Sequence, residues 1–145
     1  MYKRILIPTD GSELSVAAIR HGLTLAKALG ASVTVLTVSP PFQLIAVEPV
    51  FVPDNPEQWQ KDCDTQAERV LGVAREMAAA AGVPCDSVHV TDDHPYQAII
   101  DTARVKGCEA IVMASHGRRG VAALVLGSET TKVLTHSKIP VLVCR

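Results

Sequence analysis

Short runs rich in β-branched residues alternate with longer Ala-rich segments along this chain, and that alternation limits the fold more than any other feature. Each run is too short for a typical helix and has the Val and Ile content of a buried strand. The sequence therefore predicts five strands, over Arg4–Pro8, Ser32–Ser39, Asp86–Thr91, Ala110–Ala114 and Pro140–Cys144.

The segments between these runs show the spacing of amphipathic helices. In one of them, Val70, Ala74, Met77 and Ala81 recur three or four residues apart and mark one apolar face. Three segments end at a glycine, the residue that most readily adopts the left-handed backbone of a helix C-terminus. We therefore predict helices over Ser12–Leu29, Glu57–Ala81, Pro95–Lys106 and Ser128–His136.

The order of these elements, β-α-β-α-β-α-β-α-β, predicts an α/β fold. Strands joined by helices need right-handed crossovers, so the sheet should be parallel. Near-continuous apolar strands indicate that helices cover both faces. Aromatic residues make up only 3% of the chain, so Val, Ile, Leu and Ala should form the core. We predict one doubly wound domain over residues 1–145, with a five-stranded parallel sheet that binds ligands at the carboxyl ends of its strands.

The composition argues against several classes of function. Fourteen basic and 15 acidic residues give a net charge of −1, so no basic field favours nucleic acid. No apolar run reaches the roughly 18 residues of a membrane helix, so we expect a cytoplasmic protein without a membrane partner. The four cysteines form no CxxC pair, which argues against a zinc knuckle or a thioredoxin motif.

The stretch "PTDGS", Pro8–Ser12, directly follows the first predicted strand, where a ligand-binding turn belongs. The Asp10 carboxylate could accept hydrogen bonds from a ribose, an adenine amino group or a metal-bound water. Ser12 could cap the helix that follows. The alternative is that both side chains only cap backbone amides.

The stretch "ASHGRRGVAALVLGSET", Ala114–Thr130, follows the fourth predicted strand. We expect Gly117 and Gly120 to permit tight turns with positive φ. Gly127–Ser128 begins a helix whose exposed amides and dipole favour phosphate oxygens, and the hydroxyls of Ser128 and Thr130 could add hydrogen bonds. Two strand ends would then form one pocket, with a polar group for a nucleoside and amides for phosphates.

Three further features have two interpretations each. Arg118 and Arg119 would either reach bound phosphates or form a solvated loop tip. The proline-rich segment Pro40–Pro56 is either a flap near the ligand or a variable insertion. The stretch "HVTDDH", His89–His94, offers imidazoles and carboxylates, but its spacing matches no strong metal signature and a solvated loop is the alternative.

The chain resembles the universal stress protein family in "ILIPTDGS", in "HPYQAII", in the glycine loop and in "VLTHSKIPVLVCR". The similarity covers nearly all 145 residues and resembles single-domain members of the ATP-binding branch. That branch has a glycine, two residues, a second glycine, nine residues and then Gly-Ser or Gly-Thr. Gly117 and Gly127–Ser128 keep the nine-residue spacing, but Ala114 stands at the first glycine.

The resemblance implies an adenine nucleotide alpha hydrolase-like fold and a pocket for ATP, ADP or AMP, with or without Mg²⁺. Adenine and ribose would lie near Pro8, Thr9, Asp10 and Val38, above a floor lined by Met113. The phosphates would lie over Ala114, His116, Gly117, Gly127, Ser128, Glu129 and Thr130. His116 takes a place often held by arginine, so its phosphate contact would depend on pH.

Ala114 makes the strength of nucleotide binding depend on the backbone at this residue. At a strand end in the β region the added methyl is tolerated, whereas a positive φ would cost about 1 kcal/mol or more. We expect nucleotide binding to be retained, in weakened form. The alternative is a family member that does not bind ATP.

These observations leave three functions open. The first is a stress-response regulator that binds ATP and hydrolyses it slowly at most, because no general base is evident. The second is a nucleotide-independent interaction protein, and the third is a hydrolase, for which the sequence offers no nucleophile–base pair. The resemblance also implies a homodimer formed through the last strand, "IPVLVCR", at the sheet edge. Any other protein partners are unidentified.

Overall fold

The computed structural model describes residues 1–42, 55–117 and 126–145, and it contains the nine predicted elements with ends shifted by about one residue. The strands are β1 (Arg4–Pro8), β2 (Ser32–Ser39), β3 (Cys85–Thr91), β4 (Ala110–Ala114) and β5 (Val141–Cys144). The helices are α1 (Glu13–Leu29), α2 (Pro56–Ala81), α3 (Pro95–Val105) and α4 (Ser128–His136). Among the described residues, no helix combines the length and the apolar character needed to cross a membrane.

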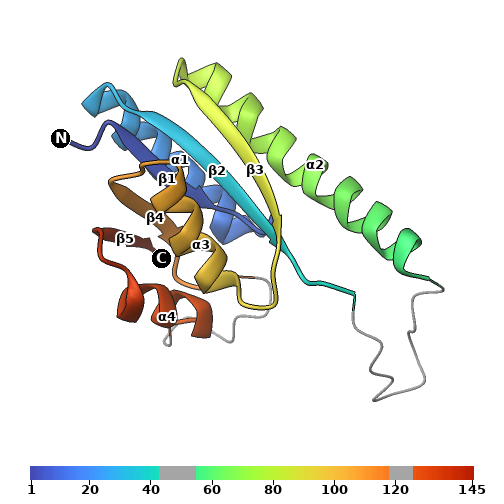
Figure 1. Ribbon diagram of the computed structural model, residues 1–145. Helices are drawn as coiled ribbons and strands as arrows, with labels where there is room; N and C mark the ends of the chain where they lie inside the picture. The colour runs from blue at the N-terminus through green and yellow to red at the C-terminus, as the bar shows by residue number, and fades with distance from the viewer. Residues whose placement is uncertain (43–54, 118–125) are drawn as a thin grey trace.

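All five strands lie parallel in one sheet, in the order β3-β2-β1-β4-β5 (Figure 1). The doubly wound parallel fold is therefore confirmed. The chain moves outward from β1 to β3, then crosses to the other side of β1 and continues through β4 to β5. The strand order thus reverses between β1 and β4, and a crevice forms at the carboxyl ends of two such strands.

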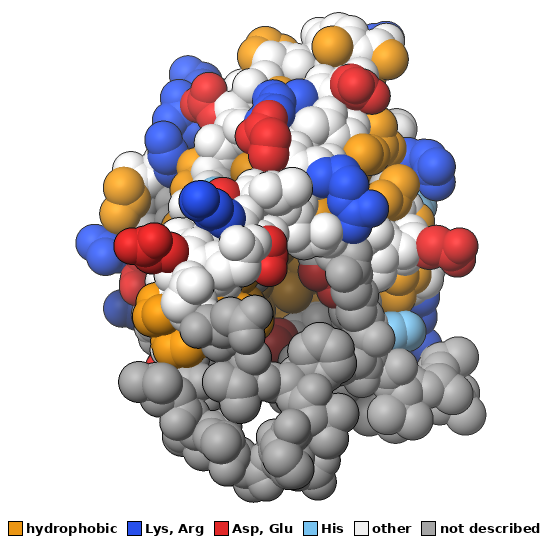
Figure 2. Space-filling view, turned by 90° about the vertical axis from the view of Figure 1, so that its right-hand side faces the viewer, with side chains coloured by type: hydrophobic (Ala, Val, Ile, Leu, Met, Phe, Trp, Pro, Cys, Tyr) orange, Lys and Arg blue, Asp and Glu red, His pale blue; other side chains and the backbone are white. Residues whose placement is uncertain are grey.

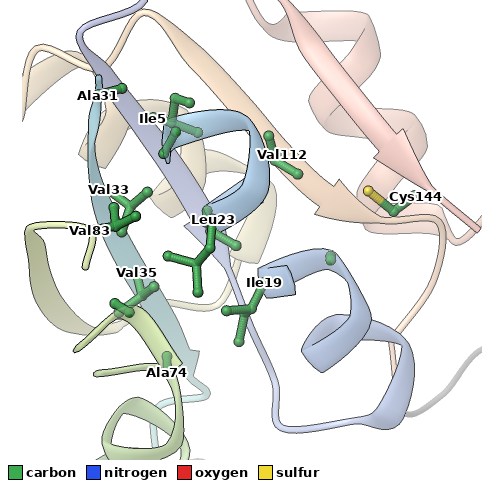
Figure 3. Close-up of a cluster of buried hydrophobic side chains, with 14 of the residues drawn as sticks. Ile5, Ile19, Leu23, Ala31, Val33, Val35, Ala74, Val83, Val112 and Cys144 are labelled. Carbon is green, nitrogen blue, oxygen red and sulfur yellow. The ribbon is translucent and has the colours of Figure 1, made fainter. Parts of the chain in front are cut away.

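Two helices cover each face of the sheet, with α1 and α2 behind it and α3 and α4 in front (Figure 1). Successive strand residues point to opposite faces, so one strand serves two cores. Ile5 and Ile7 of β1 pack on the α1/α2 side, while Leu6 packs on the α3/α4 side. Figure 3 shows the core on the α1/α2 side, where aliphatic residues from β1, β2 and β4 meet Ile19 and Leu23 of α1.

Local capping explains where the helices on the α1/α2 side begin and end. The Ser12 hydroxyl accepts a hydrogen bond from Ser15 N at 3.2 Å, and Asn55 Oδ1 accepts one from Gln58 N at 2.7 Å. Both helices end at a left-handed glycine, Gly30 with φ 67° and Gly82 with φ 71°. These caps fix the points at which the chain enters and leaves each strand.

Candidate functional site

The turn after β1 is held by hydrogen bonds among its own residues. The Thr9 and Ser15 hydroxyls lie 3.0 Å apart and are buried, and Gly11 N donates to Thr9 Oγ1 at 3.3 Å. Asp10 Oδ1 accepts from Ser12 N at 2.9 Å. The predicted cap at Ser12 is confirmed, and Asp10 and Thr9 also brace the turn. The Thr9 hydroxyl is therefore used within the turn, and its backbone is the part of Thr9 that could contact a ligand.

The turns after β1 and β4 meet at Asp10 and Gly117. A Cβ added to Gly117 would overlap Asp10 Oδ2 and would lie 3.4 Å from Asp10 Cγ. The expectation of a positive φ at Gly117 is wrong, because the positive-φ glycines of the described chain are Gly11, Gly30, Gly82 and Gly107. Glycine is favoured at residue 117 because any side chain there would have to displace the Asp10 carboxylate. Gly120 lies outside the described residues.

The start of α4 is tied to the end of β4 by two hydrogen bonds. Gly127 N donates to Ser115 O at 2.8 Å, and Thr130 Oγ1 donates to Ala114 O at 3.0 Å. A Cβ on Gly127 would lie 3.1 Å from His116 Cα, so the close backbone approach also favours glycine there. The buried Thr130 hydroxyl is thus used within the protein, and Thr130 can offer a ligand its backbone amide.

No side chain at the N-cap closes the N-terminus of α4, because Gly127 occupies that position. The first turn of any α-helix leaves backbone N–H groups without helical partners. In α4 these groups belong to Ser128, Glu129 and Thr130, and the Ser128 side chain is exposed. The helix dipole adds partial positive charge, so this end of α4 suits an anion.

Glu129 holds α3 and α4 together. Its Oε2 accepts from Tyr96 N at 2.8 Å, in the first turn of α3, and its Oε1 lies 3.5 Å from Lys132 Nζ. The carboxylate thereby caps a second helix, since His94 makes no side-chain cap. As with Thr130, the backbone of Glu129 is the part left for a ligand.

Ala114 adopts a strand conformation, and its methyl group lies in the core. It is the last residue of β4, pairs with Cys144 of β5, and is 8% exposed within the cluster on the α1/α2 side. The backbone φ of Ala114 is not positive, because Tyr2 is the only non-glycine residue with a positive φ among the described residues. Burial also raises the pKa of the neighbouring Cys144 thiol, which keeps it uncharged. The methyl group therefore carries no strain and points into packed protein.

The remaining predicted residues lie around the same end of the sheet. Val38 and Met113 belong to the apolar cluster on the α3/α4 side, and Pro8 is half-buried at the end of β1. His116 is half-buried, with its Nδ1 3.1 Å from Ser115 Oγ. Figure 2 shows the molecule from the side toward which the strands run, with recessed hydrophobic and acidic side chains beside the undescribed residues.

Two predicted features fall wholly or mostly outside the described residues. Arg118 and Arg119 lie outside them, as does most of Pro40–Pro56. Within the described chain, no three His, Cys, Asp or Glu side chains are arranged to hold a metal ion. His89 of the "HVTDDH" stretch bonds to Ser39, and no residue pattern signals this pairing because the two residues lie 50 positions apart.

Comparison with known proteins agrees with this architecture. The model of the universal stress protein family matches residues 1–145. A universal stress protein of Thermus aquaticus is 30% identical over 145 residues, covering all of both chains. The solved structure of MJ0577 from Methanocaldococcus jannaschii has a TM-score of 0.83 at 27% identity, covering 99% of this chain and 96% of that one.

A universal stress protein solved in complex with cAMP has the same fold, with a TM-score of 0.73 at 23% identity. That match covers 98% of this chain and 95% of that one. The family match spans the entire sequence. The chain belongs to the universal stress protein family.

Proposed function

We propose that the protein binds an adenine nucleotide, ATP or ADP, at the carboxyl ends of β1 and β4 and acts as a stress-response regulator. The observation that carries this proposal is the contact between the two turns. Asp10 lies against Gly117, and the backbone of the preceding residue, His116, lies against Gly127 at the start of α4. A continuous surface thus joins a carboxylate suited to ribose hydroxyls with amides suited to phosphates.

The parts of the nucleotide follow from this arrangement. The partly buried Val38 and Pro8 offer apolar surface for adenine above the buried Met113, and Asp10 offers acceptors for the ribose. The phosphates would take the amides of Ser128, Glu129 and Thr130, with His116 beside them. The Asp10 carboxylate is also a ligand type that Mg²⁺ prefers, and the ion would reduce repulsion between Asp10 and the phosphates. The solved cAMP complex of a protein with this fold supports the choice of ligand class.

The alternative of a nucleotide-independent interaction protein loses its main argument. That alternative depended on Ala114, whose methyl group packs in the core and whose φ is not positive. The buried methyl group and the unstrained backbone of Ala114 therefore support retained nucleotide binding. We infer that nucleotide binding is retained.

Thermal unfolding with and without nucleotide tests the proposal. A ligand at 100 times its Kd stabilises a protein by about 2.7 kcal/mol. Nucleotide-free protein should therefore melt several degrees higher in millimolar ATP with Mg²⁺, and GTP should raise the melting temperature less. An unchanged melting temperature at millimolar ATP would overturn the proposal. Mass spectrometry of any ligand released from freshly purified protein would identify the nucleotide.

We also propose that the protein is a cytoplasmic homodimer paired through β5. Pro140 O accepts a hydrogen bond from Ile111 N of β4 and Cys144 O accepts one from Ser115 N just after β4, so Val141 and Val143 direct their backbone polar groups outward. Leu142 is 49% exposed beside α1, where it lines a shallow depression of about 590 Å³. The unpaired edge and the exposed leucine favour strand pairing with a second copy. The four free thiols fit a reducing compartment.

Light scattering tests the dimer. Val143→Pro removes an outward N–H group at an edge position where proline is tolerated, and it should shift the protein toward monomer. Val143→Thr keeps that N–H group and should remain dimeric. Wild-type protein that is monomeric at all concentrations would contradict the proposal.

A further inference from the structure

A serine, a histidine and an aspartate from three elements meet on the α2 side of the sheet. Ser39 is the last residue of β2, His89 lies in β3, and Asp64 lies in α2. Ser39 Oγ is 2.7 Å from His89 Nε2, and Asp64 Oδ1 is 3.7 Å from His89 Nδ1. The cluster lies at β2, β3 and α2, whereas the nucleotide crevice lies between β1 and β4.

The register of the sheet explains why these side chains meet. Thr37 of β2 pairs with His89 of β3, and Ser39 pairs with Thr91. Ser39 and His89 are therefore diagonal neighbours on one face of the sheet. Their face is the one that α2 covers, since Val33 and Val35, which precede Ser39 at alternate positions, pack in the α1/α2 core. Asp64 reaches the imidazole from α2.

The order Ser–His–Asp is the arrangement that activates a serine hydroxyl. A carboxylate near Nδ1 favours the tautomer with its proton on that nitrogen, which leaves the Nε2 lone pair facing Ser39. Ser39 is 9% exposed and the His89 side chain is 22% exposed, so the imidazole is the more accessible member of the pair. Nucleophile and base thus lie within hydrogen-bond distance, as general-base activation of a serine requires.

The surroundings of Ser39 indicate which molecules would react. Phe42 and Trp59 pack edge to face with their centroids 6.4 Å apart, and Trp59 Nε1 donates to Pro40 O. Flat apolar groups suit this surface. Pro40 and Pro41 follow Ser39 and have no N–H groups, so they cannot stabilise an oxyanion. Only a donor with a good leaving group would then react, and the acyl group would leave the serine slowly.

We propose that Ser39 is an acyl-acceptor serine, activated by His89 and positioned with it by Asp64, that takes the acyl group of small activated aromatic esters. Ser39 Oγ forms a bond to the ester carbonyl carbon while its proton passes to His89 Nε2. The bond from that carbon to the phenolic oxygen breaks, and the leaving phenolate takes the proton from His89 or from water. No atom is oxidised or reduced, and the product is an ester on Ser39.

The Cys63 thiol lies beside Ser39 and is a competing nucleophile, so its reaction with an ester must be distinguished from that of the serine. Cys63 is half-buried on α2, and burial raises the pKa of its thiol, while the Ser39 hydroxyl opposes that shift. A raised pKa keeps Cys63 mostly as the unreactive thiol near neutral pH. The Cys63→Ala variant removes this competitor, so acyl transfer can be assigned to the serine.

The test incubates the full-length protein with p-nitrophenyl acetate and follows nitrophenolate release and intact mass. We expect one acetyl group on Ser39 in both the wild type and Cys63→Ala. Ser87, which is bonded to Arg75 and has no histidine partner, should stay unmodified as an internal control. Ser39→Ala should lose the modification. Acetyl groups found on Cys63 or lysines, with Ser39 unmodified, would overturn the proposal.

Variants of the base separate activation from folding. His89→Ala should slow acetylation of Ser39 about 100-fold, and added imidazole should restore part of the rate. A purely structural role of His89 would not respond to imidazole. Asp64→Asn should slow the reaction about tenfold, because the carboxylate no longer stabilises the protonated imidazole. The effect is smaller than that of His89→Ala because the carboxylate is half-exposed and solvent screens its charge. If His89→Ala does not fold, Asp64→Asn decides: an unchanged rate in a folded Asp64→Asn variant would overturn the proposal.

Discussion

The turns after β1 and β4 lie at the same crevice, but they differ in whether a side chain caps the N-terminus of the helix that follows. At α1, the Ser12 hydroxyl accepts from Ser15 N in the first turn and Asp10 accepts from Ser12 N, so side chains of this turn bond to its own backbone. At α4, the N-cap is Gly127, which has no side chain to offer. The first turn is a rigid support for a carboxylate, while the second leaves amides for an anion.

The two turns would therefore contribute differently to ligand binding. A capped turn holds its side chains in place whether or not a ligand is present, so Asp10 is preorganised. In an uncapped turn the first-turn amides bond to water, which an anionic ligand can replace, so the α4 side offers donors to a ligand. Glu129 and Thr130 anchor α4 to α3 and β4 through hydrogen bonds to Tyr96 N and Ala114 O. Each prediction below perturbs one turn and uses the other, or a matched residue, as its control.

The largest effect is expected where the two turns touch. In Gly117→Ala, the added methyl would overlap the Asp10 carboxylate and displace it. The displaced atoms end a side chain, so the fold should persist while nucleotide affinity falls about 100-fold, or about 2.7 kcal/mol. Isothermal titration calorimetry with ATP would measure this loss.

The matched control for that substitution is Gly72→Ala in the interior of α2. Its added methyl meets no atom nearer than Arg75 Nη2 at 3.8 Å. Affinity should be unchanged, and stability should rise by about 0.5–1 kcal/mol because alanine suits a helix interior better than glycine. Equal ATP affinity in both variants would show that the ligand does not use the Asp10–Gly117 contact.

A proline at the first position of each helix compares the two N-termini directly. Ser128→Pro removes one amide of α4, which should weaken ATP binding about tenfold, since a hydrogen bond to a charged group contributes about 1.5–3 kcal/mol. Glu13→Pro removes the equivalent amide of α1 and should change affinity less than twofold. Both preceding residues have extended backbones that accept proline, with ψ 152° at Gly127 and 159° at Ser12.

A proline at the first position of a helix is compatible with helix formation in this protein. Pro56 and Pro95 stand at the first positions of α2 and α3. Circular dichroism should therefore show unchanged helix content in both variants. Similar losses of affinity in Ser128→Pro and Glu13→Pro would remove the distinction between the turns.

Stability should separate the same two turns in the reverse direction. Ser12→Ala removes the cap of α1 and should lower the free energy of unfolding by about 1 kcal/mol in urea titrations. Ser128→Ala changes an exposed side chain one residue inside α4, so the effect should be within about 0.5 kcal/mol. A larger loss in Ser128→Ala would mean that the α4 turn is stabilised by its own side chain.

The sequence predicted the elements well because their signals are local. Apolar periodicity, strand composition and terminal glycines all act within a few residues, and they located α1 and β2 to within about one residue. The position of the turns after β1 and β4 at one edge of the sheet followed from the parallel topology, because strands of one direction end on the same side. Local pattern and topology were therefore sufficient for the fold and for expecting these two turns at one edge of the sheet.

The roles of individual side chains could not be predicted because their partners are distant in sequence. Glu129 and Thr130 were expected at phosphates, but their side chains bond to Tyr96 N and Ala114 O. Gly117 was expected to supply a positive φ, whereas it supplies space. Such partners depend on how helices pack, and no residue pattern encodes that packing directly.

The smallest effect on affinity is expected at Ala114, and it decides between the two functional classes. The methyl group packs in the α1/α2 core, away from any backbone strain, so Ala114→Gly should change ATP affinity less than twofold. It should still lower the free energy of unfolding by about 1 kcal/mol. Glycine loses more backbone entropy than alanine when the chain folds, and the core loses a buried methyl group. Parallel calorimetry and urea unfolding measure the two effects on one preparation. If Ala114→Gly bound ATP and the wild type did not, the protein would be a nucleotide-independent member of its family, since one methyl group would then be what closes the site.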